Sequence, residues 1–249
     1  MNETIKLMMQ HRSIRAYSEQ VPSDEMIETM VKAGMQAAFA GQLGSVIVSK
    51  DRAKNPFAAP LYFIVCVDLH RMEQVMQQRG WELKSTDSAM LLFGMQDASY
   101  LAQNLVLAAE SLGLGTCYLG FVPFQAEANL KRFDLPPRVF PMVGISVGYP
   151  AENPPTRPRY PLEFACFPEK YPRFSAEQIK DASQQMDEGY LAQNYYKDGK
   201  LMIQLEQKTE TYDATNYSWT EHISRKWGQW LDDEAELKEI MQKYGFYKD

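Results

Sequence analysis

Cysteine and histidine are scarce in this sequence. The 249-residue chain contains three of each, and neither type is spaced like a metal site, which needs ligands in close pairs such as CxxC. The cysteines lie far apart, so we expect them to be reduced and mostly structural; they are Cys66, Cys117 and Cys166. His11 has arginines rather than carboxylates as its neighbours. A zinc or iron site and a disulfide framework are therefore not expected.

Positive charge and long apolar runs are also lacking. The 26 lysines and arginines are outnumbered by 32 aspartates and glutamates, which gives a net charge of -6. This balance argues against nucleic acid as a partner, because phosphate contacts need a basic face. No apolar run reaches the roughly 18 residues that cross a bilayer, and the N-terminal MNETIKLMMQ lacks a signal peptide's apolar stretch. We therefore expect a cytoplasmic protein.

Motifs for common reactions are missing or misplaced. No GxSxG elbow marks a serine hydrolase. The glycines of SLGLGTCYLG suggest a dinucleotide-binding loop, but a Rossmann loop runs from strand to helix, and here a helix precedes and a strand follows. We interpret Gly113 and Gly115 as a helix C-cap and a tight strand entry. Gly120 differs, because it ends a strand where a planar ligand could approach the backbone.

The sequence is long enough, with 45% hydrophobic residues, to bury the core of one sizeable domain. A helix is predicted after the capping Ser23, and a long one from about Ser88 to Leu112 that ends at Gly113. Strands are predicted at Ser45 to Ser49 and Leu61 to Val67, both as interior strands, and at Thr116 to Gly120 and Met142 to Pro150. This order of elements predicts a mixed α/β or α+β layer structure.

Two stretches have more apolar or aromatic surface than an ordinary surface helix and suggest burial in the core or against a partner surface. LVLAA (Leu105 to Ala109) is apolar on every side, so its helix is either central to the core or part of a subunit interface. After Pro150 the chain becomes an extended, proline-rich segment and then polar helices, which we interpret as an arm. Its last helices carry three of the four tryptophans, Trp219, Trp227 and Trp230, and need a partner surface to bury those rings.

Two basic clusters stand out from the acidic background: HRSIR near the start and RPR, from Arg157 to Arg159, on the extended segment. The proline fixes the backbone between the two arginines, so both guanidinium groups could reach one anion, and phosphate suits such forks. Each cluster alone also has an ordinary explanation. Cations are favoured at a helix C-terminus, and an Arg-Pro-Arg loop is often a solvated surface.

Taken in order, HRSIRAY, LAQNLVLAAESLGLG running into TCYLG, VGISVGYPAENPPTRPRYP and YSWTEHISRK resemble the FMN-dependent nitroreductase family, and most closely its NADPH-preferring nitroreductase and flavin reductase branch. The resemblance spans most of the chain. It implies an α+β fold, a three-layer α/β/α sandwich with a mixed, mainly antiparallel sheet and an extended C-terminal helical arm, as a homodimer. Residues 1–150 would form the FMN-binding core. Residues 151–249, the basic loop and helical arm, would belong to the same domain and wrap the dimer.

The resemblance also assigns the site. It implies that the phosphate and ribityl end of FMN are held by His11, Arg12, Ser13, Arg157 and Arg159. Arg15 would lie at the pyrimidine edge of the ring, where a fixed positive charge favours the reduced flavin. The strand end would cover the ring, with its backbone near N5, through Tyr118, Leu119 and Gly120. Gln42 is a further candidate ring contact.

Some positions depart from the family pattern. Relatives usually have a second glycine and then arginine or asparagine after Gly120, whereas this chain has Phe121, Val122 and Pro123, so we expect an altered substrate face. Relatives also carry a serine-rich stretch before the first strand, where this chain has AAFAGQLG. A glutamine contact expected between the first two strands has no placeable counterpart. In some relatives an arginine binds the 2′-phosphate of NADPH. Its counterpart would lie near Tyr195 to Lys200, where this chain has no clear equivalent.

The resemblance therefore predicts an NAD(P)H oxidoreductase that reduces nitroaromatics, quinones, azo compounds or flavins by ping-pong hydride transfer through flavin N5. Two alternatives stay open. One is a specialised flavin enzyme that acts on a single metabolite, with Phe121 narrowing the pocket. The other is an FMN-binding protein without catalytic activity.

Overall fold

The computed structural model describes residues 1–206, 208–229 and 234–247, and the chain divides into two compact units. The first contains Met1–Pro154 and the C-terminal helix α8 (Glu234–Lys243). The second runs from Pro155 through α7 (Trp219–Gln229). Each unit is described by itself.

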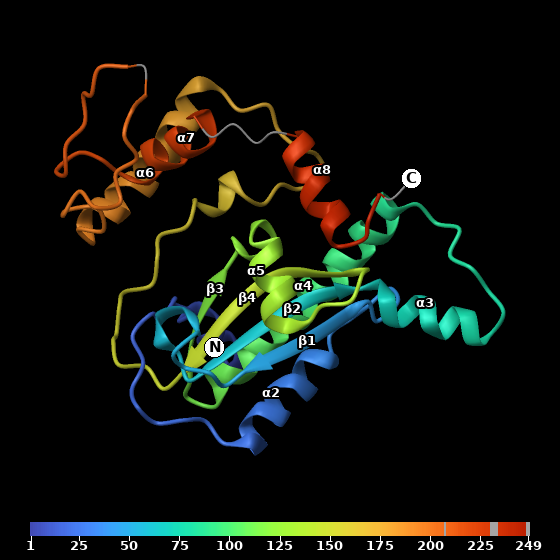
Figure 1. Cartoon of the computed structure of the whole chain (residues 1–249). Coiled ribbons are helices and arrows are strands. Elements are labelled where there is room, and N and C mark those ends of the chain that lie inside the picture. Colours follow the sequence, from blue (N-terminus) through green and yellow to red (C-terminus); the bar gives the residue numbers. More distant parts are fainter. Residues whose placement is uncertain (207, 230–233, 248–249) are drawn as a thin grey trace. The chain divides into compact units, whose positions relative to one another are not determined.

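The first unit is built on a four-stranded sheet, which Figure 1 shows in the order β1-β2-β4-β3. All neighbouring strands of the sheet pair antiparallel. A parallel bridge joins Ser13, which lies outside the four strands, to Thr116 of β3. The four predicted strands are confirmed as β1 (Gly44–Ser49), β2 (Leu61–Asp68), β3 (Gly115–Leu119) and β4 (Val139–Gly148). The prediction that β1 is an interior strand is wrong: β1 is the outermost strand of this sheet and only half-buried.

Two helices cover one face of the sheet. They are α2 (Asp24–Met35) and α4 (Asp87–Ser111), which the sequence predicted. The Ser23 side chain accepts the amide of Met26 at the start of α2, and Gly113 ends α4 with φ 79°, the left-handed conformation of a helix C-cap. A Cβ at Gly34 of α2 would lie 3.4 Å from Leu105 of α4, so the two helices pack closely. Leu105 is fully buried, which makes the apolar stretch of α4 a central core segment.

The opposite face carries shorter elements. Arg132 of α5 (Ala126–Phe133) lies over the Tyr62 ring of β2, and Tyr244, just after α8, meets Phe140 of β4 edge to face at 5.2 Å. The sequence assigned α8 to the C-terminal arm, but in the structure its Ile240 and Met241 are buried in the core of the first unit. The predicted three-layer α/β/α arrangement is confirmed. Further short elements of this unit include α1 (Glu3–Met9), η1 (Pro56–Ala58), α3 (Leu69–Gln78) and η2 (Val122–Phe124).

The second unit contains η3 (Leu162–Phe164), the polar helix α6 (Ala176–Ala192) and α7. α6 begins with a capping box between Ser175 and Gln178. A small aromatic core joins α6 to α7 through Met186, Tyr190, Tyr196 and Tyr217, with Trp219 packed against it. Trp227 is 60% exposed, and Trp230 lies outside the described residues. In the described part of the chain, no helix is long and apolar enough to span a membrane.

Candidate functional site

The basic segment near the N-terminus lies along the start of β3. The amide of Ile14 donates to the carbonyl oxygen of Thr116 at 2.7 Å, and a backbone bridge joins Ser13 to Thr116. A Cβ at Gly115 would lie 2.7 Å from the Ile14 side chain, closer than real Cβ contacts allow. Gly115 is therefore required for this close approach, and the structural interpretation of Gly113 and Gly115 is confirmed.

His11 contacts a carboxylate, which corrects the expectation that it lies only among arginines. Its Nδ1 is 2.6 Å from Oε1 of Glu110, at the end of α4. The Thr116 hydroxyl donates to the same oxygen at 2.9 Å. The sequence could not reveal this partner, because Glu110 follows His11 by 99 residues. The signal it does carry is a lone carboxylate inside the otherwise apolar LVLAAESLGLG.

The segment after β4 joins the first basic motif. Arg12 donates through Nη1 to the Asn153 side chain and, at 3.2 Å, to the carbonyl oxygen of Pro154. The Glu152 carboxylate accepts the backbone amides of Arg15 and Ala16. Residues 152–154, which precede the second basic cluster in the chain, therefore lie against the first basic motif within the first unit. Sequence reasoning missed Glu152, although it stands inside the quoted GYPAENPP.

Ser13 and Arg15 share a buried neighbour, the Cys117 thiol of β3. Burial raises the pKa of Cys117, while the positive charge of Arg15 and the Ser13 hydroxyl oppose that rise. Arg15 itself is exposed, so its guanidinium remains accessible. All three cysteines are free, as predicted, with Cys66 and Cys117 buried and Cys166 exposed.

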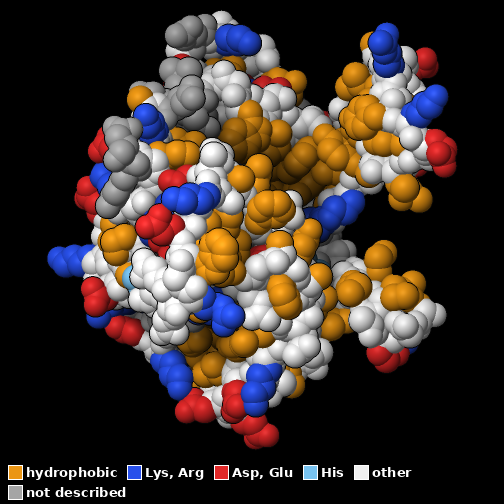
Figure 2. All heavy atoms as spheres, turned by 90° about the vertical axis from the view of Figure 1, so that its right-hand side faces the viewer, with side chains coloured by type: hydrophobic (Ala, Val, Ile, Leu, Met, Phe, Trp, Pro, Cys, Tyr) orange, Lys and Arg blue, Asp and Glu red, His pale blue; other side chains and the backbone are white. Residues whose placement is uncertain are grey.

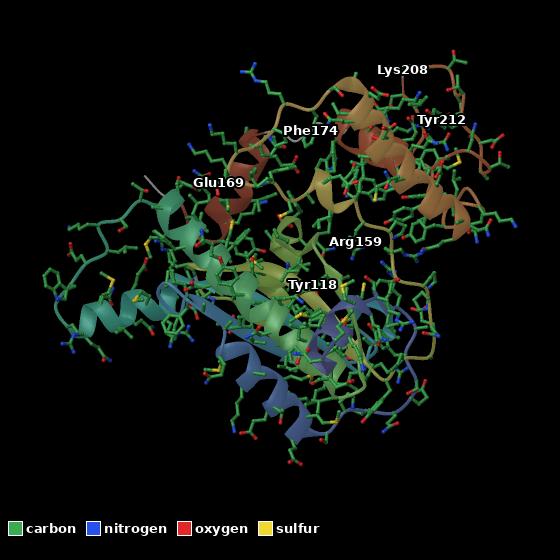
Figure 3. All side chains as sticks on the ribbon, turned by 180° about the vertical axis from the view of Figure 1, so that it is seen from behind. Tyr118, Arg159, Glu169, Phe174, Lys208 and Tyr212 are labelled. Carbon is green, nitrogen blue, oxygen red and sulfur yellow. The ribbon has the colours of Figure 1, made fainter. Side chains whose placement is uncertain are left out.

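The end of β3 is open. A Cβ added at Gly120 would meet no described atom within 4 Å, so there is room for a flat ligand beside the backbone. Tyr118 and Leu119 are half-buried just before it, and the Tyr118 hydroxyl donates to Gln103 of α4 at 3.3 Å. Figure 3 marks Tyr118 on this strand. Burial raises the pKa of Tyr118, so its hydroxyl stays protonated and acts as a donor.

An aromatic pair follows the open glycine. Phe121 is 51% exposed and its ring centroid lies 5.2 Å from that of Phe124, in the short helix η2 (Val122–Phe124). Val122 is buried, and the Asn129 side chain donates to its carbonyl oxygen at 2.8 Å. The departure noted in the sequence therefore places apolar rings, on an anchored turn, beside Gly120.

Gln42 lies on a different cavity from Arg12. Its loop is fixed by the buried Asp97 of α4, whose carboxylate accepts the amides of Ala40, Gly41 and Leu43 at 2.6 to 3.0 Å. Gln42 lines a cavity of about 280 Å³ with residues of α2, β1 and α4, whereas Arg12 lines a groove of about 220 Å³ with Glu110 and Glu152. A single chain therefore does not bring Gln42 together with the basic segment.

The second basic cluster belongs to the second unit. Arg157 donates to the Gln193 side chain at 2.7 Å, and its guanidinium lies 4.1 Å from the centre of the Tyr195 ring. Arg159 donates to the carbonyl oxygens of Arg157 and Pro158 and is exposed, as labelled in Figure 3. A Cβ at Gly189 would lie 2.7 Å from Pro158, so the backbone between the arginines packs tightly on α6. Both side chains are held, and Arg159 is accessible.

These features fit a phosphorylated, planar cofactor better than a metal. Cationic side chains suit a phosphate, and the open Gly120 leaves the space that a ring beside the backbone would need. Among the residues that the structure describes, no group of three His, Cys, Asp or Glu side chains is arranged to hold a metal ion.

Comparisons with known proteins agree with this arrangement. The model of the nitroreductase family matches residues 48–149. The chain is 30% identical over 239 residues to an oxygen-insensitive NADPH nitroreductase of Salmonella typhimurium. The aligned region covers 90% of this chain and 91% of that relative. It is 31% identical over 179 residues to an FMN reductase (NADPH) of Bacillus subtilis, with 66% of this chain and 72% of the relative covered.

Solved structures give the same result for the fold. NfrA1 of B. megaterium superposes with a TM-score of 0.83 at 28% identity, covering 99% of this chain and all of the other. NfrA2 of B. megaterium has a TM-score of 0.82 at 27% identity over 99% of this chain and 98% of the other.

Proposed function

Because the chain belongs to the nitroreductase family, we propose that it is an FMN-dependent NAD(P)H oxidoreductase that reduces nitroaromatics, quinones or flavins. Relatives named as an FMN reductase (NADPH) and an oxygen-insensitive NADPH nitroreductase support both the cofactor and the donor. The cytoplasm, where reduced nicotinamide nucleotides are available, is the proposed location.

One observation carries the proposal: the basic segment runs beside a strand that ends at an open glycine. The segment is fixed to β3 through Ile14 and Thr116, and Arg12 holds Pro154, which precedes Arg157 by three residues in the chain. We assign the phosphate and ribityl end of FMN to the cationic and hydroxyl side chains of both motifs, namely His11, Arg12, Ser13, Arg157 and Arg159.

The chain's own residues perform four tasks in this proposal. The two motifs bind the anionic end, and Tyr118, Leu119 and Gly120 border the ring. Arg15 supplies a fixed positive charge at the pyrimidine edge, which favours the reduced state. When bound, FMN supplies the hydride-accepting N5 atom. The aromatic pair of Phe121 and Phe124 excludes water from one side of the acceptor's entry.

The proposal includes a homodimer. α4 exposes hydrophobic side chains between Leu92 and Tyr100, with Leu92 64%, Phe93 49% and Tyr100 48% exposed. Figure 2 shows hydrophobic side chains gathered in several patches on one face of the molecule. A second copy covering α4 would bury them. It would also allow Gln42 of one copy to reach the flavin bound by the other. The segment from Pro155 through α7 is proposed to wrap this second copy.

A spectrum of the purified protein tests the proposal. We expect a yellow protein whose absorbance near 450 nm bleaches when NADPH or NADH is added without oxygen, and returns when a quinone or a nitroaromatic follows. A yellow protein that neither donor bleaches would instead be an FMN-binding protein without this activity. A colourless protein that takes up no added FMN would contradict the proposal.

A second candidate function rests on Phe121. Its ring is 51% exposed and follows Gly120 directly, where the resemblance implies a second glycine, and in a specialised enzyme this ring would narrow the pocket to one metabolite. Turnover on a panel of nitro compounds and quinones separates the two, because a general reductase reduces most of the panel and a specialised enzyme is nearly inert on all of it.

A further inference from the structure

The end of α4 places a carboxylate against a histidine of the candidate site. The Glu110 side chain is 11% exposed and that of His11 is 29% exposed, with Nδ1 and Oε1 2.6 Å apart. Thr116, which is fully buried, donates its hydroxyl to the same carboxylate oxygen at 2.9 Å. Glu110 is therefore held in one position by a strand on one side and meets the imidazole on the other.

A carboxylate at this place is unfavourable unless a cation faces it. Glu110 lies in the last turn of α4, next to its final residue, Ser111, and that turn contains no basic residue. The negative end of the helix dipole destabilises an anion there. His11 follows the C-terminal cap of α1, so a positive charge on its ring is favoured by the ends of both helices. The Glu110 carboxylate and the C-terminal ends of both helices thus place negative charge around the His11 ring.

An imidazolium carries a proton on each ring nitrogen. Nδ1 donates to Glu110, and Nε2 has no hydrogen-bond partner in the part of the chain that the structure describes. A protonated Nε2 is a charged donor, and an anion is its natural acceptor. A neutral ring with its proton on Nδ1 would leave Nε2 as an acceptor, to which a fully ionised phosphate has no proton to donate.

We propose that Glu110 is a positioning residue that acts through His11, holding its ring as an imidazolium whose Nε2 donates to the phosphate of FMN. This inference rests on the proposed function, since it takes FMN as the ligand. Glu110 touches no ligand itself. Its carboxylate sets the orientation and charge of the ring, as the carboxylate partner of a histidine does in other sites.

Flavin titrations of the apoprotein test this role. The variants are Glu110→Gln, which keeps the size and removes the charge, His11→Asn, and the two combined. Glu3→Gln is the matched control, because Glu3 is exposed and its ion pair, among the described residues, is with Lys6 of the same helix, α1. Quenching of flavin fluorescence gives the dissociation constants for FMN and for riboflavin, which lacks the phosphate.

We expect Glu110→Gln to weaken FMN binding about tenfold, the effect of losing one charge-assisted hydrogen bond, and to leave riboflavin binding unchanged. In the His11→Asn background, Glu110→Gln should not change the dissociation constant for FMN further, because the imidazole that Glu110 positions is absent. Glu3→Gln should bind both flavins like the unmodified protein.

A spectroscopic measurement on the unmodified holoprotein avoids any dependence on how the variants fold. In ¹⁵N spectra of histidine-labelled protein, the His11 ring should carry protons on both nitrogens when FMN is bound. A neutral His11 ring in the holoprotein would overturn the inference. So would equal losses for FMN and riboflavin, or an undiminished effect of Glu110→Gln in the His11→Asn background. If the unmodified protein binds neither flavin, the proposed function itself fails.

Discussion

At the scale of single residues, an acidic protein uses carboxylates to position a basic site. Glu152 holds the backbone of Arg15 and Ala16, and Glu110 holds the ring of His11. Asp97 holds the loop of Gln42 in the same way. Each of these carboxylates lies far from its partner in sequence, so the spacing of residues gave no indication of the pairs. The cationic members were predicted from the sequence because they are clustered.

Two glycines make contrasting predictions. Gly115→Ala should destabilise the fold by about 1–3 kcal/mol, because its Cβ would overlap the Ile14 side chain and push the basic segment away from β3. Gly120→Ala should leave the free energy of unfolding nearly unchanged, since its Cβ meets open space, but should weaken FMN binding by crowding the ring.

Urea unfolding and flavin titration of the two variants check this pair of predictions. Equal stability of both variants would show that the basic segment does not depend on the close approach at Gly115. Unchanged FMN affinity in Gly120→Ala would remove Gly120 from the flavin site.

At the scale of elements, local signals predicted most helices and strands. Ser23 and Gly113 marked helix ends through capping, which depends on neighbouring residues only. The exposure of β1 and the packing of α8 on the first unit depend on which element lies beside which. Neither was predictable, because hydrophobic runs of outer and inner strands look alike, and α8 reaches the core across a long stretch of chain.

The helix α7 carries a pH-dependent contribution to stability. Burial, and next the charge of Lys226, lower the pKa of His222 below its ordinary 6.5, and its Nδ1 lies 3.1 Å from the Tyr217 hydroxyl. The unfolded chain therefore binds the proton more readily than the folded one. His222 contributes its full stability above about pH 6.5, and that contribution is lost as the pH falls below this value.

We expect His222→Gln to reduce the stability difference between pH 7.5 and pH 5.5, measured by urea unfolding. An identical pH dependence in the His222→Gln variant and the unmodified protein would contradict this account of α7.

At the scale of the whole molecule, the basic clusters belong to two compact units of one chain. The sequence alone predicts their role as a site, through their residue types and the resemblance of the full pattern to a family. A single copy does not bring all of the predicted site residues together, because Gln42 lines a separate cavity, and α4 exposes Phe93 and Tyr100. A site assembled from two copies, as we propose, cannot be predicted from the hydrophobic periodicity of one chain.

The proposed dimer predicts a mass near twice 28.6 kDa by light scattering. Phe93→Glu combined with Tyr100→Glu, one face of α4, should give the mass of a single chain, because two charges would be buried at the interface. Val75→Glu on α3 serves as the matched exposed control. A single-chain mass for the unmodified protein would contradict the dimer.

The central claim is that both basic motifs hold one flavin nucleotide. It is tested most directly by the FMN content per chain of the purified unmodified protein and of an Arg157→Ala, Arg159→Ala variant, with Arg173→Ala, an exposed arginine of the same unit, as control. We predict about one FMN per chain in the unmodified protein and the control, and little or none in the double variant. A double variant that keeps its full FMN content would contradict the claim.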